Sequence, residues 1–199
     1  MKISIISTSH RKGSQSSRVS KILSTKLNLI DKGVNIFNFD FSEYNPPLWS
    51  PEKKEKVGFW GNEWVMVSEE LKSSEGFIYI VPEYGGMAAP NAKNFFLICG
   101  EGELAHKPGL LVSISSGNGG AYPVSELRSS SYKNTHIMWI PENIIIRNVE
   151  HYDPGNNGNL IPEWLDNRID YSIELFLAYA KYMKPLRQIV NRKDFGNGM

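Results

Sequence analysis

The stretch GFIYIVPEYGG at residues 76–86 decides the fold class of this 199-residue chain. Its first six residues form an almost unbroken apolar run, which is typical of a β-strand covered on both faces. Pro82 ends that strand, and Gly85 and Gly86 then indicate a tight loop. A strand that is buried on both faces belongs to a parallel sheet with helices on either side, so we expect an α/β protein.

The same reading extends outward in both directions. Apolar patterns of strand type occur at 3–7, 34–39, 76–81, 110–114 and 137–140. Patterns of helical period occur between them, at 19–30, 57–73, 91–100 and 122–133. This alternation predicts βαβ units with right-handed crossovers.

The remaining C-terminal part departs from that alternation. We expect a short extra strand at 144–146, a turn-rich loop at 151–159 and a long helix at 162–183. One domain is expected over residues 1–185, followed by a polar tail over 186–199.

Composition excludes several functional classes. Lys and Arg number 22 against 21 Asp and Glu, and no long run of one sign occurs, which disfavours nucleic acid or a polybasic membrane contact. The single Cys99, with four His, forms no disulfide framework and no zinc set, so Cys99 is expected in the core and no metal is expected. No apolar run approaches the roughly 20 residues that span a bilayer. We therefore expect a soluble, cytoplasmic protein.

Three of the predicted strands end in unusual loops, at 8–17, 82–90 and 115–120. In an open parallel sheet, ligands bind outside the carboxyl ends of the strands. All three loops would lie at that edge, so we predict that they form one site.

The first loop places hydroxyl groups and a cation just ahead of a helix: Ser9, Arg11, Ser14, Ser16 and Ser17. Hydroxyls and free N–H groups at a helix N-terminus form a phosphate cradle, and the arginine would add a charge-assisted bond. The alternative is helix capping by Ser16 or Ser17 in a solvated loop. The loop carries neither a dinucleotide fingerprint nor a nucleoside-triphosphate loop.

The second and third loops suit a flat ligand. Glycine permits close approach of the backbone, and tyrosine offers an apolar face with a polar tip. Both loops can also be read as ordinary strand-terminating turns, with the glutamate solvated or capping. The candidate binding residues here are Pro82, Glu83, Tyr84, Gly85, Ser115, Ser116, Gly117 and Gly119.

These motifs resemble, in order, those of the NADPH-dependent FMN reductase family. SHRKGS at 9–14 is similar to its Gly-Ser-x-Arg-x-x-Ser loop, and PEYGG at 82–86 to its Pro-Glu-Tyr-Asn-Gly segment. Lys93-Asn94, Lys107-Pro108 and SSGNGG at 115–120 match further segments of the family. Two departures are that Thr8 stands where the family has Gly, and Gly85 where it has Asn.

The resemblance implies a flavodoxin-like fold, with a five-stranded parallel sheet of order 2-1-3-4-5 and helices on both faces. It implies FMN, with its phosphate in the first loop and its isoalloxazine ring beside Tyr84 and the third loop. NADPH or NADH would reduce the flavin, which would pass electrons by a ping-pong scheme to a small acceptor such as a quinone, free flavin, nitro or azo compound. No catalytic side chain is required.

Two alternatives remain. An FMN-binding electron carrier or sensor would share the fold, although such carriers are usually strongly acidic and this chain has a net charge of +1. Thr8 and Gly85 also leave open a domain that has lost FMN.

The resemblance further implies a homodimer or homotetramer. Trp60, Trp64, Val67 and Leu71 suffice to bury one face of the helix at 57–73, which leaves Trp49, Phe59 and Met66 without an evident partner. Exposed aromatic patches often mark interfaces, so we predict that this helix lies in the contact. The alternative is that Trp49 packs under the long loop at 40–56.

Overall fold

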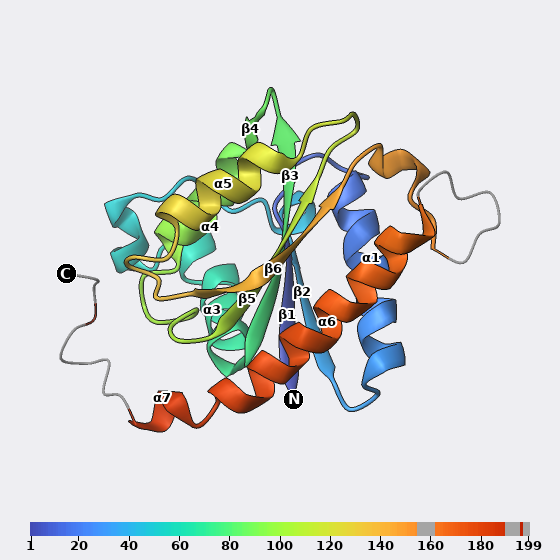
Figure 1. The fold of residues 1–199 in the computed structure, drawn as a ribbon. Helices are drawn as coiled ribbons and strands as arrows, with labels where there is room; N and C mark the ends of the chain where they lie inside the picture. The colour runs from blue at the N-terminus through green and yellow to red at the C-terminus, as the bar shows by residue number, and fades with distance from the viewer. Residues whose placement is uncertain (155–161, 190–195, 197–199) are drawn as a thin grey trace.

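The computed structural model describes residues 1–154, 162–189 and 196. Five strands lie side by side in the order β2-β1-β3-β5-β6, and every neighbouring pair is parallel (Figure 1). The short β4 pairs antiparallel with the end of β3. The strands are β1 Lys2–Ser7, β2 Asn35–Asp40, β3 Gly76–Tyr84, β4 Met87–Ala88, β5 Pro108–Ile114 and β6 Met138–Ile146. The predicted flavodoxin-like order of the five parallel strands is confirmed.

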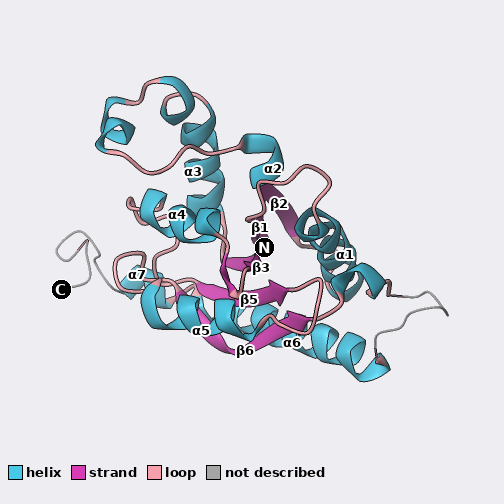
Figure 2. Ribbon diagram, turned by 90° about the horizontal axis from the view of Figure 1, so that it is seen from above, coloured by secondary structure: helices cyan, strands magenta, loops and turns pink. Residues whose placement is uncertain are grey.

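Helices cover both faces of the sheet (Figure 2). One face packs against α1 and α6, and the other against α3, α4 and α5. In β3, Ile78 and Ile80 enter the first core, whereas Phe77, Tyr79 and Val81 enter the second. The apolar run at 76–81 is unbroken because alternate residues each meet a layer of helices. The helices are α1 Gln15–Ile30, α2 Phe41–Tyr44, α3 Glu63–Ser73, α4 Pro90–Ile98, α5 Ala121–Ser130, α6 Glu163–Met183 and α7 Leu186–Ile189.

The last strand corrects the prediction of a separate strand at 144–146. β6 runs without a break from Met138 to Ile146, and its register against β5 shifts between Gly109 and Leu111. The shift absorbs the extra residues around Pro141, which is tolerated because β6 is an edge strand. The Arg128 guanidinium donates hydrogen bonds to the carbonyl oxygens of Ile140 and Glu142 in this irregular stretch.

The helix predicted at 57–73 begins later, at Glu63. A short 3₁₀ turn, Gly58–Trp60, precedes it, and Gly58 has a φ of +57°, which interrupts a right-handed helix. Trp60 and Trp64 are buried as predicted, and Trp49 and Met66 are about half exposed. The prediction that Phe59 has no partner within the chain is wrong. Phe59 packs against Trp60 and the core.

The long C-terminal helix is present and follows Pro162 directly. Part of the predicted loop at 151–159 and most of the predicted polar tail fall outside the described residues. Within the described part of the tail, α7 forms one short helix. Among the residues that the structure describes, no helix is long and apolar enough to cross a membrane.

Candidate functional site

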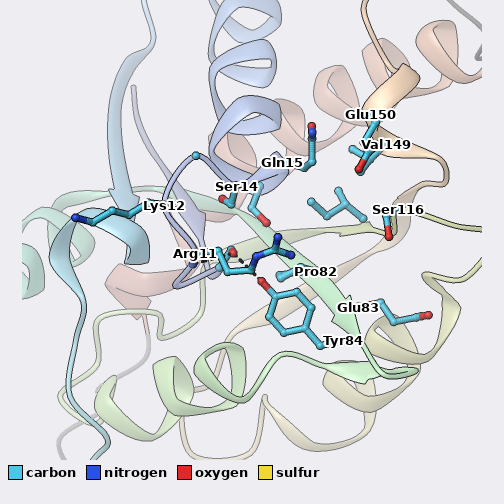
Figure 3. Close-up of a pocket in the computed structure, with 14 residues that line it drawn as sticks. Arg11, Lys12, Ser14, Gln15, Pro82, Glu83, Tyr84, Ser116, Val149 and Glu150 are labelled. Carbon is cyan, nitrogen blue, oxygen red and sulfur yellow. Dashed lines mark hydrogen bonds between the residues drawn. The ribbon is translucent and has the colours of Figure 1, made fainter.

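The loops that follow β1, β3, β5 and β6 meet at the carboxyl edge of the sheet and enclose a cavity of about 200 Å³ (Figure 3). The first turn of α1 and the 3₁₀ turn after β6, Val149–His151, complete its walls. The cavity is lined by Ser9, Arg11, Lys12, Gly13, Ser14, Gln15, Ser16, Pro82, Glu83, Tyr84, Ile114, Ser116, Val149 and Glu150.

The N-terminus of α1 forms the most polar wall of this cavity. Ser14 is the N-cap, and its Oγ accepts a hydrogen bond from the Ser17 N–H at 3.1 Å, so the alternative of capping by Ser16 or Ser17 is not what the structure shows. Ser16 is fully buried, lines the cavity, and its Oγ has no partner within the described residues. The first turn carries no acidic side chain. This wall therefore presents hydroxyl and N–H donors, together with the positive end of the helix dipole, to an anion.

The first two loops are joined by a pair of hydroxyl groups. Ser9 Oγ and the Tyr84 hydroxyl lie 2.7 Å apart, and Ser9 Oγ also accepts from the Arg11 N–H at 3.3 Å. Figure 3 shows the Arg11 side chain extending over the cavity beside Tyr84, whereas Lys12 points away from the other labelled residues. The ring of His10 meets that of Tyr84 edge-on.

A β-hairpin forms the second loop, with Gly85 and Gly86 as its two turn residues. Both have positive φ, +59° and +77°, as a two-residue hairpin turn of type I′ requires. Asparagine also tolerates this conformation, so the replacement of Asn by Gly85 preserves the turn. On α5, Glu126 holds the hairpin by accepting from the Ala88 N–H and by pairing with Lys93, which lowers the pKa of this carboxyl.

Glu83 connects the second loop to the third. Its carboxylate accepts a hydrogen bond from the Gly120 N–H at 2.5 Å, immediately before α5. A Cβ at Gly119 would lie 2.0 Å from Glu83 Oε1, so the absence of a side chain there lets the carboxylate approach. The capping role considered for Glu83 is therefore what the geometry shows.

The third loop is held from behind by the turn after β6. The carbonyl oxygens of Ser115, Gly117 and Asn118 accept from Val149 N, Asn148 N and Arg147 Nε, at 2.8–3.0 Å. Because these contacts occupy the loop's carbonyl groups, the loop is fixed before any ligand arrives.

Arg18 fastens the same turn to α1. Its guanidinium donates to the carbonyl oxygens of Val149 and Tyr152, and its Nε donates to the Gln15 side chain at 2.6 Å. Gln15 and Val149 both line the cavity, so Arg18 connects two of its walls from outside.

Of the thirteen binding residues predicted from sequence, the cavity brings together eight: Ser9, Arg11, Ser14, Ser16, Pro82, Glu83, Tyr84 and Ser116. Five do not line it. Ser17 bonds to Ser14 and Gly85 occupies the hairpin turn, while in the third loop the Gly117 N–H donates to Ser115 Oγ and Gly119 lies against the Glu83 carboxylate.

Sequence reasoning missed the wall formed by Val149 and Glu150. The prediction ended the fifth strand at Ile140, whereas β6 continues to Ile146. With the correct strand end, residues 147–150 follow a parallel strand at its carboxyl edge, which is the rule that identified the other loops.

Other motif residues have structural roles. Thr8 is buried and donates through its hydroxyl to the Ile80 carbonyl at 2.9 Å, which ties β1 to β3. Asn94 bonds to Trp49 N and Pro47 O and so holds the long loop. Lys107 donates to the carbonyl oxygens of Leu71, Lys72 and Glu103, and burial lowers its pKa to about 7.

Cys99 is almost fully buried, and burial raises the pKa of its thiol well above the usual value. Over the described residues, no group of three or more His, Cys, Asp or Glu side chains is placed to hold a metal ion.

The strand order and the site at the carboxyl edge define a flavodoxin-like protein. Residues 1–151 match the family of NADPH-dependent FMN reductases, and the chain belongs to this family. The family binds FMN and uses NAD(P)H as the electron donor, which confirms the predicted cofactors. The chain is accordingly an NAD(P)H-dependent flavin oxidoreductase.

Solved structures share the fold at low sequence identity. FerB, a flavoenzyme NAD(P)H:(acceptor) oxidoreductase from Paracoccus denitrificans, superposes with a TM-score of 0.72 at 17% identity, over 92% of this chain and 98% of FerB. The apo form of the NADH:FMN oxidoreductase EMOB gives 0.69 at 12% identity, over 89% of each chain. A flavodoxin from the domain Archaea gives 0.54 at 14% identity, over 92% of this chain and 99% of the flavodoxin. No match was found among curated protein sequences.

Proposed function

We propose that this chain binds FMN at the carboxyl edge of its sheet and passes electrons from NADPH or NADH to a small acceptor such as a quinone, free flavin, nitro or azo compound. The observation that carries the proposal is the cradle at the N-terminus of α1. Ser16 is fully buried, its Oγ has no partner among the residues that the structure describes, and it lines the cavity together with Arg11, in a helix first turn without acidic side chains. A buried orphan hydroxyl costs free energy, which a bound phosphate would recover.

The residues present fit the cofactor. The cavity of about 200 Å³ is smaller than the ~300–1,000 Å³ of common ligand pockets, so it suits the phosphate and its nearby sugar chain rather than a whole flavin nucleotide. The ring system would then extend outward between the hairpin and the third loop. When bound, FMN supplies the redox chemistry. The chain's part is to bind the phosphate and to hold the second and third loops together through the hydrogen bond from the Gly120 N–H to Glu83.

Because a bound flavin carries the redox chemistry, turnover of varied small acceptors requires no catalytic side chain. The alternative, an electron carrier or sensor, is disfavoured by the net charge of +1, because such carriers are usually strongly acidic. Retention of the cradle also disfavours a domain that has lost FMN.

The test is anaerobic reduction followed by reoxidation. The FMN-loaded protein is mixed with NADPH or NADH and its visible spectrum is recorded, and a quinone is then added. We expect the flavin band to bleach and then return. If dithionite bleaches the band but neither nicotinamide does so within minutes, the carrier or sensor function replaces the proposal.

We also propose a homodimer or homotetramer with α3 in the contact. Trp49 and Met66, about half exposed, support an interface near this helix. Light scattering of the FMN-loaded protein should give at least twice 22.5 kDa, and substitution of Met66 by Glu should lower the mass. A mass near 22.5 kDa for the unaltered protein at tens of micromolar would contradict the assembly.

A further inference from the structure

The Tyr84 side chain is held by a contact at its hydroxyl end. Its ring had been expected beside the isoalloxazine, where a flat side chain contributes by stacking. In the structure its hydroxyl instead reaches back across the cavity to Ser9, in the loop ahead of α1. The edge of the ring is turned to His10, at 6.0 Å between centroids and 83° between planes.

The two hydroxyl groups retain one O–H that is free to donate. Ser9 Oγ accepts from the Arg11 N–H, and one O–H serves the 2.7 Å contact between Ser9 and Tyr84. Each hydroxyl has a single hydrogen, so whichever residue donates, the other keeps its own. Within the described residues neither hydroxyl makes a further hydrogen bond. Ser9 is 1% exposed and Tyr84 is half-buried, and both residues line the cavity.

A free hydroxyl beside Arg11 and the first turn of α1 matches the chemistry of a phosphate group, which accepts several charge-assisted hydrogen bonds. We propose that the Tyr84 hydroxyl belongs to the phosphate-binding part of the site, where with Ser9 it selects phosphorylated flavin over riboflavin. This inference rests on the proposed function. It adds that the hairpin contributes to recognition of the phosphate as well as of the ring system.

The test compares two ligands that differ only in the phosphate. Apoprotein is titrated with FMN and with riboflavin, followed by quenching of flavin fluorescence, for the unaltered chain and for Tyr84→Phe. Loss of a charge-assisted bond should weaken FMN at least about tenfold and leave riboflavin within about twofold. Tyr122→Phe is the matched control, because it removes a hydroxyl from an exposed tyrosine of the neighbouring α5, and both affinities should be unchanged.

Three further variants strengthen the test. Tyr84→Met removes the ring as well, and the proposal expects the same FMN-selective loss. Ser9→Ala should also weaken FMN and leave riboflavin nearly unchanged. The double variant Ser9→Ala with Tyr84→Phe should lose no more FMN affinity than the two single variants lose together, because each substitution removes part of the same hydroxyl pair. Thermal unfolding of each apoprotein reports whether the variant is folded.

The outcomes separate clearly. Equal weakening of FMN and riboflavin by Tyr84→Phe or Tyr84→Met would overturn the proposal. Tyr84 would then contact the isoalloxazine ring rather than the phosphate. Unchanged affinity for both ligands would also overturn it. Failure of the unaltered chain to bind either flavin would contradict the proposed function itself, and this inference with it.

Discussion

The first and third loops lie at the same edge of the sheet but use their polar groups in opposite ways. In the first loop the buried Ser16 Oγ has no partner among the described residues, and it lies in the first turn of α1, at the positive end of the helix dipole. In the third loop the carbonyl groups of Ser115, Gly117 and Asn118 and the N–H of Gly120 are already bonded within the protein. The comparison indicates that the first loop supplies free energy of ligand binding, whereas the polar groups of the third loop hold the site in its shape.

The largest expected effect is on ligand binding at the first loop. Arg11→Ala should weaken FMN by about 1.5–3 kcal/mol, because a charge-assisted bond to phosphate is lost. The apoprotein should be as stable as before, since the side chain is exposed. Fluorescence titration and thermal unfolding measure the two quantities, and unchanged FMN affinity would reduce Arg11 to a solvated loop residue.

A substitution in the part of the site that is already bonded within the protein should lower the stability of the protein rather than its affinity for FMN. Arg18→Met removes bonds to Val149, Tyr152 and Gln15, and we expect the free energy of unfolding of the apoprotein to fall by about 2 kcal/mol. Urea unfolding without ligand measures it. Arg147→Met, which removes one bond from an exposed residue, is the control and should cost less. Equal losses in both variants would show that Arg18 does not clamp the wall.

Lys107 immediately precedes β5 and so lies at the opposite edge of the sheet from the cavity. It allows a prediction of how stability depends on pH. The folded protein releases its proton at about pH 7, whereas the unfolded chain keeps it to about 10.5, so unfolding takes up a proton between these values. Stability should therefore rise with pH across this window, by at most about 1.4 kcal/mol per pH unit.

Urea unfolding at several pH values from 7 to 10 measures the slope, and Lys107→Met should flatten it. That variant also loses three hydrogen bonds, so the slopes rather than the absolute stabilities are compared. FMN affinity should be unaffected. A slope that persists in Lys107→Met would assign the proton uptake to other groups.

The smallest effect concerns Ser16, which separates binding from folding most cleanly. Ser16→Ala should weaken FMN by about 1 kcal/mol, the usual contribution of one hydrogen bond. The apoprotein should be no less stable, because the hydroxyl that is removed has no partner. Loss of stability with unchanged FMN affinity would reverse the role assigned to Ser16.

The sheet could be predicted from the sequence because a strand buried on both faces has an unbroken apolar run, as at 76–81. The sequence also predicted which loops converge, since parallel strands end at one edge. It failed where tertiary context decided. The fifth strand was predicted to end at Ile140, whereas β6 continues through Pro141, because an edge strand with an irregular register accommodates the proline. Capping by Ser16 or Ser17 was the alternative reading of the first loop, yet Ser14 caps α1, and Ser16 Oγ has no partner among the described residues.

Side-chain direction was the other limit. Periodicity places Glu83 and Tyr84 at the end of β3, but it does not show that one carboxylate turns to Gly120 and one hydroxyl to Ser9. Arg18 gave no signal, because its acceptors are backbone carbonyls more than 130 residues further along the chain.

The central claim is that the first loop binds the phosphate of FMN, and equilibrium titration of the apoprotein with FMN at increasing concentrations of inorganic phosphate tests it most directly. The account predicts saturable binding at micromolar FMN that phosphate weakens by competition, with a smaller effect on riboflavin. Saturable FMN binding that phosphate does not weaken would place the nucleotide elsewhere. An absence of saturable binding at micromolar FMN would contradict the account entirely.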